Sequence, residues 1–187
     1  MPNWLILLIA IGVPILIFVS MYNALVAGKN LAKNGWAQID VQLKRRADLI
    51  PNLVETVKGA MSHERETLEA VIAARNQAVN LQGSDDLAAR VKAEGALTGM
   101  MTRFMALMEK YPDIKATQNV SQLQEELSST ENRIGFARQH YNDVATKFNT
   151  RTEQIPWNII AGMGDFKPFP LFEVTETAER EAPKVSF

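Results

Sequence analysis

The feature that most constrains this chain is its N-terminus, where the first charged side chain is Lys29. Residues 4–19 read WLILLIAIGVPILIFV. A helix needs about 20 apolar residues, and at least roughly 17, to cross the hydrocarbon core of a bilayer. Trp4 and Tyr22 lie at the two ends of the stretch, where aromatic side chains favour the headgroup level. We therefore expect residues 1–21 to form a transmembrane anchor that contacts the bilayer through residues 4–21.

A cleaved signal peptide is the alternative interpretation of this stretch. The segment MPN before the apolar run has no Lys or Arg, and no clear A-x-A cleavage site follows the run. Both observations favour an uncleaved anchor.

The charges that follow the anchor predict its orientation. Residues 22–46 contain five basic side chains and a single acidic one, Asp40. The basic residues are Lys29, Lys33, Lys44, Arg45 and Arg46. Lys and Arg next to a span favour the cytoplasm. We expect a single-pass protein of the cell (inner) membrane with its N-terminus outside and its body in the cytoplasm. Only two of these lysines lie close to the bilayer, so the reverse topology stays open.

Composition excludes several classes of function. The net charge is −1, which gives no broad basic surface for nucleic acid. The chain has no cysteine, which excludes disulfides, thiolate metal sites and a cysteine nucleophile.

Helical periodicity dominates residues 22–155, for which we expect an all-α fold: the transmembrane helix runs into a long antiparallel four-helix, coiled-coil-like bundle. The first helix has one apolar face and is expected to end or turn at Pro51: Leu25, Ala32, Trp36, Ile39, Leu43, Ala47 and Ile50. The second spans about residues 53–81, and the third about 85–109 with Ser84 as its N-cap. The fourth spans about residues 119–152, after a break at Tyr111-Pro112. Short turns imply antiparallel neighbours, so the end of the fourth helix is expected near the bilayer.

The residues of this body resemble the LemA family of bacterial membrane proteins. The resemblance covers about residues 22–160, through YNALV, WAQIDVQLKRRADLIPNLVETVKGAMSHE, AARNQA, EKYPDIKATQNVSQLQEELSSTENRIGFARQHYND and FNTR. The resemblance implies one N-terminal anchor and a long antiparallel four-helix bundle. It implies no established enzymatic activity, cofactor or catalytic residue.

Charged residues on the apolar seam of the second predicted helix suggest a buried polar layer. Counting helical levels from Pro51 places Glu64 level with Asp40, Arg103 and Glu131, and places Arg75 level with Asn142-Asp143. We expect ion-paired polar side chains that set helix register: Asp40, Glu64, Arg75, Arg103 and Glu131. The alternative is a carboxylate–histidine metal site that includes His63. Such bundle sites need Glu-x-x-His pairs, which the sequence lacks. We therefore expect no metal ion and no other cofactor.

Two further groups of residues are candidates for contacts. Arg45, Arg46 and Asp48 lie near the far tip of the first helix, either as a partner-docking tip or as a solvated, helix-capping cluster. The segment 156–174 holds too many apolar groups to remain in water, among them Trp157, Ile159, Ile160, Phe166, Phe169 and Phe172. It is expected to fold back on the bundle, to bind a neighbouring subunit or to enter the membrane interface. Residues 175–187 are expected to be disordered.

These features predict a non-enzymatic, membrane-anchored helical scaffold that forms homo-oligomers. The alternative is an adaptor that binds an unidentified protein partner, such as a membrane protease or envelope-stress system. An enzyme or metal protein is the least favoured class.

Overall fold

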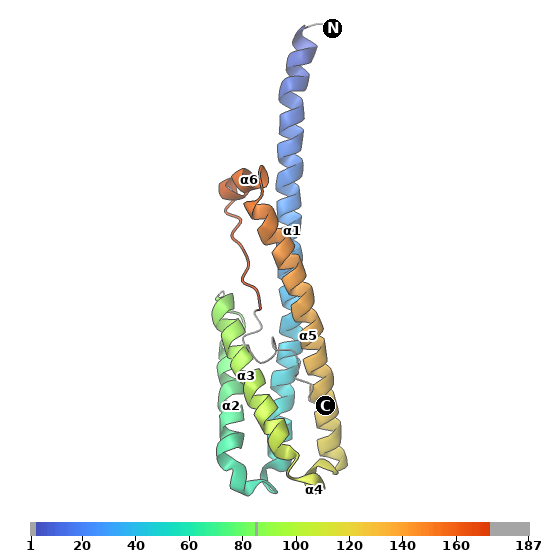
Figure 1. Ribbon diagram of the computed structural model, residues 1–187, viewed down its shortest axis with the longest axis vertical. Helices are drawn as coiled ribbons and strands as arrows, with labels where there is room; N and C mark the ends of the chain where they lie inside the picture. The colour runs from blue at the N-terminus through green and yellow to red at the C-terminus, as the bar shows by residue number, and fades with distance from the viewer. Residues whose placement is uncertain (1–2, 85, 173–187) are drawn as a thin grey trace, which may run out of the picture.

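The computed structural model describes residues 3–84 and 86–172, and its regular elements are all helical, as predicted (Figure 1). The expected disordered tail, 175–187, lies outside the described residues. The elements are α1 (Asn3–Lys58), η1 (Ser62–Glu64), α2 (Arg65–Asn80), α3 (Leu87–Met108), α4 (Pro112–Lys115), α5 (Gln118–Glu153) and α6 (Trp157–Met163).

The N-terminal third of α1 stands free of the other described helices, and the remainder forms part of the helical body, residues 22–172 (Figure 1). Among the described residues, α1 is the one helix long and apolar enough to cross a membrane, and only 11% of its most apolar stretch is buried. All seven residues of the predicted apolar face, from Leu25 to Ile50, are buried.

The prediction that α1 ends or turns at Pro51 is wrong, because the helix continues to Lys58. Proline lacks the N–H that would bond the carbonyl four residues earlier. That carbonyl belongs to Ala47, and Arg75 Nε donates to it instead at 3.0 Å. A side chain from α2 thus replaces the lost backbone hydrogen bond. The chain reverses at residues 59–64, so α2 begins at Arg65 and is shorter than expected.

The helices alternate in direction along the chain (Figure 1). α5 packs along α1, whereas α2 and α3 form a hairpin beside the half of α1 far from the free end. α1 and α5 approach closely: a Cβ on Gly28 would lie 3.1 Å from Phe148 Cδ2. α5 agrees with the predicted fourth helix within about a residue. The N-cap of α3 is Asp86 and not Ser84, since the Asp86 carboxylate accepts from the Ala89 N–H at 3.0 Å.

Three apolar clusters follow one another along the body. The far cluster joins α1, α2, α3 and α5 around Leu53 and Phe104. The middle cluster joins α1 and α5 around Trp36 and Tyr141. The near cluster joins α1, α5 and α6 around Leu25, beside the free stretch of α1. The end of α5 therefore lies on the side of the body where the apolar stretch of α1 emerges.

Candidate functional site

A buried network of charges centred on Arg46 lies between the far and middle clusters. Arg46 is fully buried. Its Nη1 donates to Glu131 Oε1 at 2.6 Å and to Thr98 Oγ1 at 2.9 Å, and its Nη2 bonds Glu94 Oε2. One side chain of α1 thereby joins α3 to α5. Because burying an unpaired charge is costly, loss of either carboxylate partner would destabilise the contact among these three helices.

A second ion pair lies one level closer to the anchor. Arg90 of α3 bonds the carboxylate of Asp40 on α1, and its guanidinium lies 4.8 Å from the centre of the Trp36 ring. Burial raises the pKa of Asp40, while the Arg90 charge opposes this change. On α5, burial also lowers the pKa of Arg138, with the Arg46 charge contributing in the same direction.

The predicted polar layer of five residues does not assemble as one layer. Asp40 and Glu131 belong to the two ion pairs above, with partners other than those expected. Glu64 is half-buried in η1 and accepts a hydrogen bond from the Tyr111 hydroxyl at 3.1 Å. Arg75 caps the Ala47 carbonyl, and Arg103 is exposed. The predicted neighbours were wrong because the prediction placed the first reversal of the chain at Pro51, whereas the chain reverses about ten residues later.

The predicted docking tip divides into two kinds of residue. Arg45 and Asp48 are exposed, and Arg45 lies 3.8 Å from Glu126 in a surface ion pair. Arg46 is buried, so its assignment to a docking surface is wrong. A signal for this was available in the sequence, because Ile39, Leu43, Arg46 and Ile50 step by four, three and four along the apolar face. In α3, Arg90 and Glu94 likewise lie on the buried apolar face, because Arg90, Glu94, Leu97 and Met101 are spaced by four, three and four residues.

The C-terminal segment folds back along α5 through two asparagines one heptad apart. Asn149 donates from Nδ2 to the Phe169 carbonyl and accepts from the Phe169 N–H, both at 2.8 Å. Asn142 makes the same pair of bonds with Phe172, both at 2.9 Å. Seven helical residues and three extended residues both span roughly 10 Å, so the two repeats match. This pairing was not predicted, since a polar residue on a helix surface usually only contacts water.

Aromatic packing completes this attachment. The Phe172 ring stacks on Trp36 at 5.3 Å between centroids, and Phe169 meets Phe148 at 5.4 Å. Of the six apolar residues singled out, Ile160 and Phe166 are buried; Trp157, Phe169 and Phe172 are half-buried; Ile159 is 64% exposed. The segment thus folds back on the body, which was one of the three expectations, but it leaves part of α6 uncovered.

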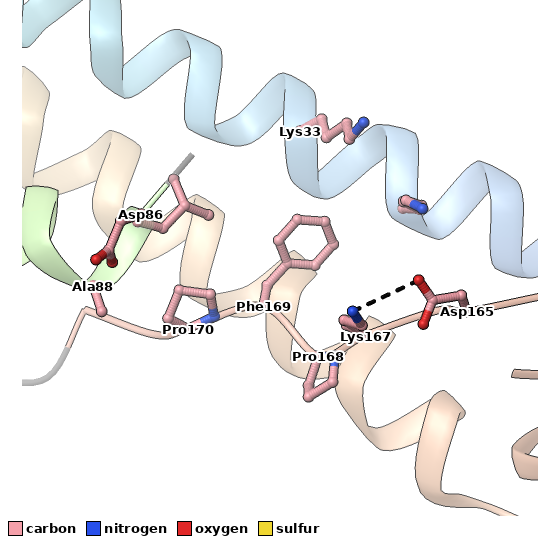
Figure 2. A pocket seen from close by; sticks show the side chains of 10 residues that line it. Lys33, Asp86, Ala88, Asp165, Lys167, Pro168, Phe169 and Pro170 are labelled. Carbon is pink, nitrogen blue, oxygen red and sulfur yellow. Dashed lines mark ion pairs between the residues drawn. The ribbon is translucent and has the colours of Figure 1, made fainter. Parts of the chain in front are cut away.

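Two hollows mark the surface of the body. One, of about 470 Å³, lies between α1, the start of α3 and the C-terminal segment, with Lys29 and Lys33 in its lining. Figure 2 shows Lys167 paired with Asp165 on the C-terminal segment, across from Lys33 on α1; the pair measures 3.7 Å. Among the described residues, no group of three or more His, Asp or Glu side chains is placed to hold a metal ion.

The second hollow, of about 420 Å³, lies on the outer face between α1 and α5. Two large apolar side chains in its lining face water, Val41 at 65% and Phe136 at 73% exposure. The remaining lining residues are polar or small: Gln38, Gln42, Arg133, Ala137 and His140. Sequence reasoning did not single out Phe136, which stands off the α5 seam.

Comparisons with known proteins show which family the chain resembles. A LemA protein of Metamycoplasma hominis is 25% identical across 90% of this chain and 76% of that protein. Magnetosome protein MamQ 2 of Paramagnetospirillum magneticum is 31% identical across 43% of this chain and 30% of that protein. Magnetosome protein MamQ of Magnetospirillum gryphiswaldense is 25% identical across 81% of this chain and 64% of that protein. The chain thus spans less than two thirds of these magnetosome relatives. The model of the LemA family matches residues 35–187, most of the chain, and the protein therefore belongs to the LemA family.

Proposed function

We propose that this protein is a non-enzymatic, membrane-anchored scaffold: an antiparallel four-helix bundle that self-associates through the outer face of α1 and α5. The observation that carries the proposal is the exposed pair Val41 and Phe136 beside a shallow hollow. An aromatic side chain left 73% exposed on a rigid helix is the type of residue that is enriched at protein interfaces.

The rest of the body supports a structural role. Its buried charges, Arg46 and Glu94 among them, are bonded to one another and join helices. A side-chain network of this kind holds a surface rigid, and a rigid self-complementary surface favours a symmetric dimer. A polar lining around Phe136 supplies the hydrogen-bonding rim that such an interface uses.

The test compares two variants of the full chain in a mild detergent. Phe136→Ser removes the proposed contact, and Met163→Ser is its matched control, because Met163 is also 73% exposed but lies on α6. We measure the mass of the solubilised protein by light scattering as a function of concentration. A loss of oligomer in Phe136→Ser alone is expected.

A monomeric protein, or an oligomer that Phe136→Ser leaves intact, would contradict self-association through this face. A monomer that still pulls down one defined membrane protein through Phe136 would favour the adaptor function. A loss of oligomer in Met163→Ser alone would assign the contact to α6.

The proposal also places the body in the cytoplasm, with the N-terminus outside. The chain has no native cysteine, so Ser128→Cys and Ser186→Cys each introduce a single thiol. We expect both to be protected from a membrane-impermeant maleimide in intact cells and to be labelled after lysis. Labelling of Ser128→Cys in intact cells would reverse the orientation.

A further inference from the structure

The short helix α6 has one covered face and one bare apolar face. Ile160 and Ala161 are buried against α1 and α5. Ile155, Ile159 and Met163 follow one another at intervals of four residues and are 83%, 64% and 73% exposed. Residues four apart lie on one side of a helix, so Ile159 and Met163 share one face of α6, and Ile155 lies in the turn just before that helix. We call these three exposed apolar side chains the α6 ridge.

The α6 ridge lies at the level where the apolar stretch of α1 enters the body. Tyr22 and Phe166 meet edge to face with ring centroids 5.6 Å apart, and Leu25 belongs to the cluster that covers α6. Figure 1 shows α6 at the end of the body nearest the free stretch of α1, with no other helix of the body beyond it.

Helix geometry sets where the bilayer surface falls. Residues 4–21 span roughly 26 Å at 1.5 Å per residue, close to the thickness of the hydrocarbon core. The next turns of α1, up to Lys29, therefore cross the headgroup layer. Since α6 packs against Leu25 within these turns, an anchor that spans residues 4–21 would hold the α6 ridge close to the boundary between headgroups and acyl chains.

Two cations stand beside the aromatic rings at this level. Lys29 Nζ lies 5.3 Å from the centre of the Phe166 ring, and the Arg151 guanidinium lies 5.6 Å from that of Trp157. Interfacial segments combine buried apolar side chains with Lys, Arg and Trp at the phosphate level. The nearest acids along the chain, Glu153 and Asp165, lie outside α6 on either side.

We propose that the α6 ridge inserts into the surface of the same bilayer that α1 crosses. The ridge would act as a second membrane contact, which fixes the angle of the body to the membrane in a way that a single helix cannot. The inference rests on the membrane anchoring in the proposed function. We choose lipid over a second copy of the chain because α6 packs beside Leu25, in the turns of α1 that directly follow its exposed apolar stretch.

The test uses single spin labels on the full chain in nanodiscs of phosphatidylcholine and phosphatidylglycerol, which leave both membrane faces open to reagents. The label at Ile159→Cys reports the ridge, and Ser128→Cys, exposed on α5, is the water-facing control. Leu16→Cys, in the middle of the apolar stretch, is the buried control. We measure the ratio of collision rates with oxygen, which concentrates in lipid, and with a water-soluble nickel chelate.

We expect the ratio at Ile159→Cys to lie between those of the two controls and clearly above that of Ser128→Cys. A ratio equal to that of Ser128→Cys, with Leu16→Cys deep in lipid, would overturn the ridge and leave the anchor intact. If Leu16→Cys were itself exposed to the chelate, the anchor would fail as well. Dipolar broadening at Ile159→Cys that disappears on dilution with unlabelled protein would place a second copy on the ridge and overturn the lipid contact.

Discussion

Arg45 and Arg46 are adjacent in one helix and differ mainly in their surroundings. Arg46 is fully buried and bonds groups on α3 and α5. The side chain of Arg45 is 48% exposed and lies 3.8 Å from Glu126. Replacing each by alanine removes the same charge and the same stem, so the comparison isolates the effect of burial.

The structure predicts very different losses of stability for the two variants. Arg46→Ala leaves the Glu94 carboxylate, only 6% exposed, without its partner. Breaking a buried ion pair in this way costs about 3–5 kcal/mol, whereas an exposed pair contributes about 0.2–1 kcal/mol. For a chain of this size 1 kcal/mol changes the melting temperature by about 2–4 °C. We therefore expect Arg46→Ala to lower the Tm by about 6–20 °C, and Arg45→Ala by at most about 4 °C.

Thermal unfolding of the full chain in a mild detergent, followed by far-UV circular dichroism, measures both shifts. Equal shifts in the two variants, or an unchanged Tm in Arg46→Ala, would refute the reasoning. A further variant separates charge from volume: Arg46→Met combined with Glu94→Leu and Glu131→Gln removes all three charges together. It should be more stable than Arg46→Met alone, because the Glu94 carboxylate is no longer left buried without its partner.

Three further predictions follow from single contacts. Arg75→Ala should cost about 1 kcal/mol more in the native chain than in a Pro51→Ala background, where residue 51 can itself donate to Ala47; a double-mutant cycle in urea measures this coupling, and a value of zero would contradict it. Burial raises the pKa of Tyr141 to about 12. The folded state then keeps the Tyr141 proton to higher pH than the unfolded state, so the contribution of Tyr141 to stability is constant below about pH 10 and falls as the pH rises toward 12. Tyr141→Phe should remove this part of the fall, and unfolding curves at a series of pH values test it. Glu64→Ala should lower stability by only about 1 kcal/mol, since a half-buried carboxylate loses one hydrogen bond to a tyrosine; a loss above about 3 kcal/mol would indicate a buried ion pair instead.

The parts of this fold that local patterns specify could be predicted from the sequence. The apolar run marks the free N-terminal third of α1, and the three–four spacing marks its buried face from Leu25 to Ile50. The same spacing marks the seam of α5, and Tyr111-Pro112 marks the break before it. Each of these signals lies within a few turns of the residues that it describes, because helical side chains repeat every 3.6 residues.

Tertiary structure alone decided which groups meet. Arg75 reaches a carbonyl 28 residues away and lets α1 continue through Pro51. Arg46 pairs with groups 48 and 85 residues away, and Asn142 binds a backbone 30 residues further on. A buried polar group needs a partner wherever the fold provides one, and no local pattern records that partner's position. The sequence therefore determined the helices and their apolar faces, whereas the folded chain determined where the chain reverses, which charges are buried and which face of α6 remains bare.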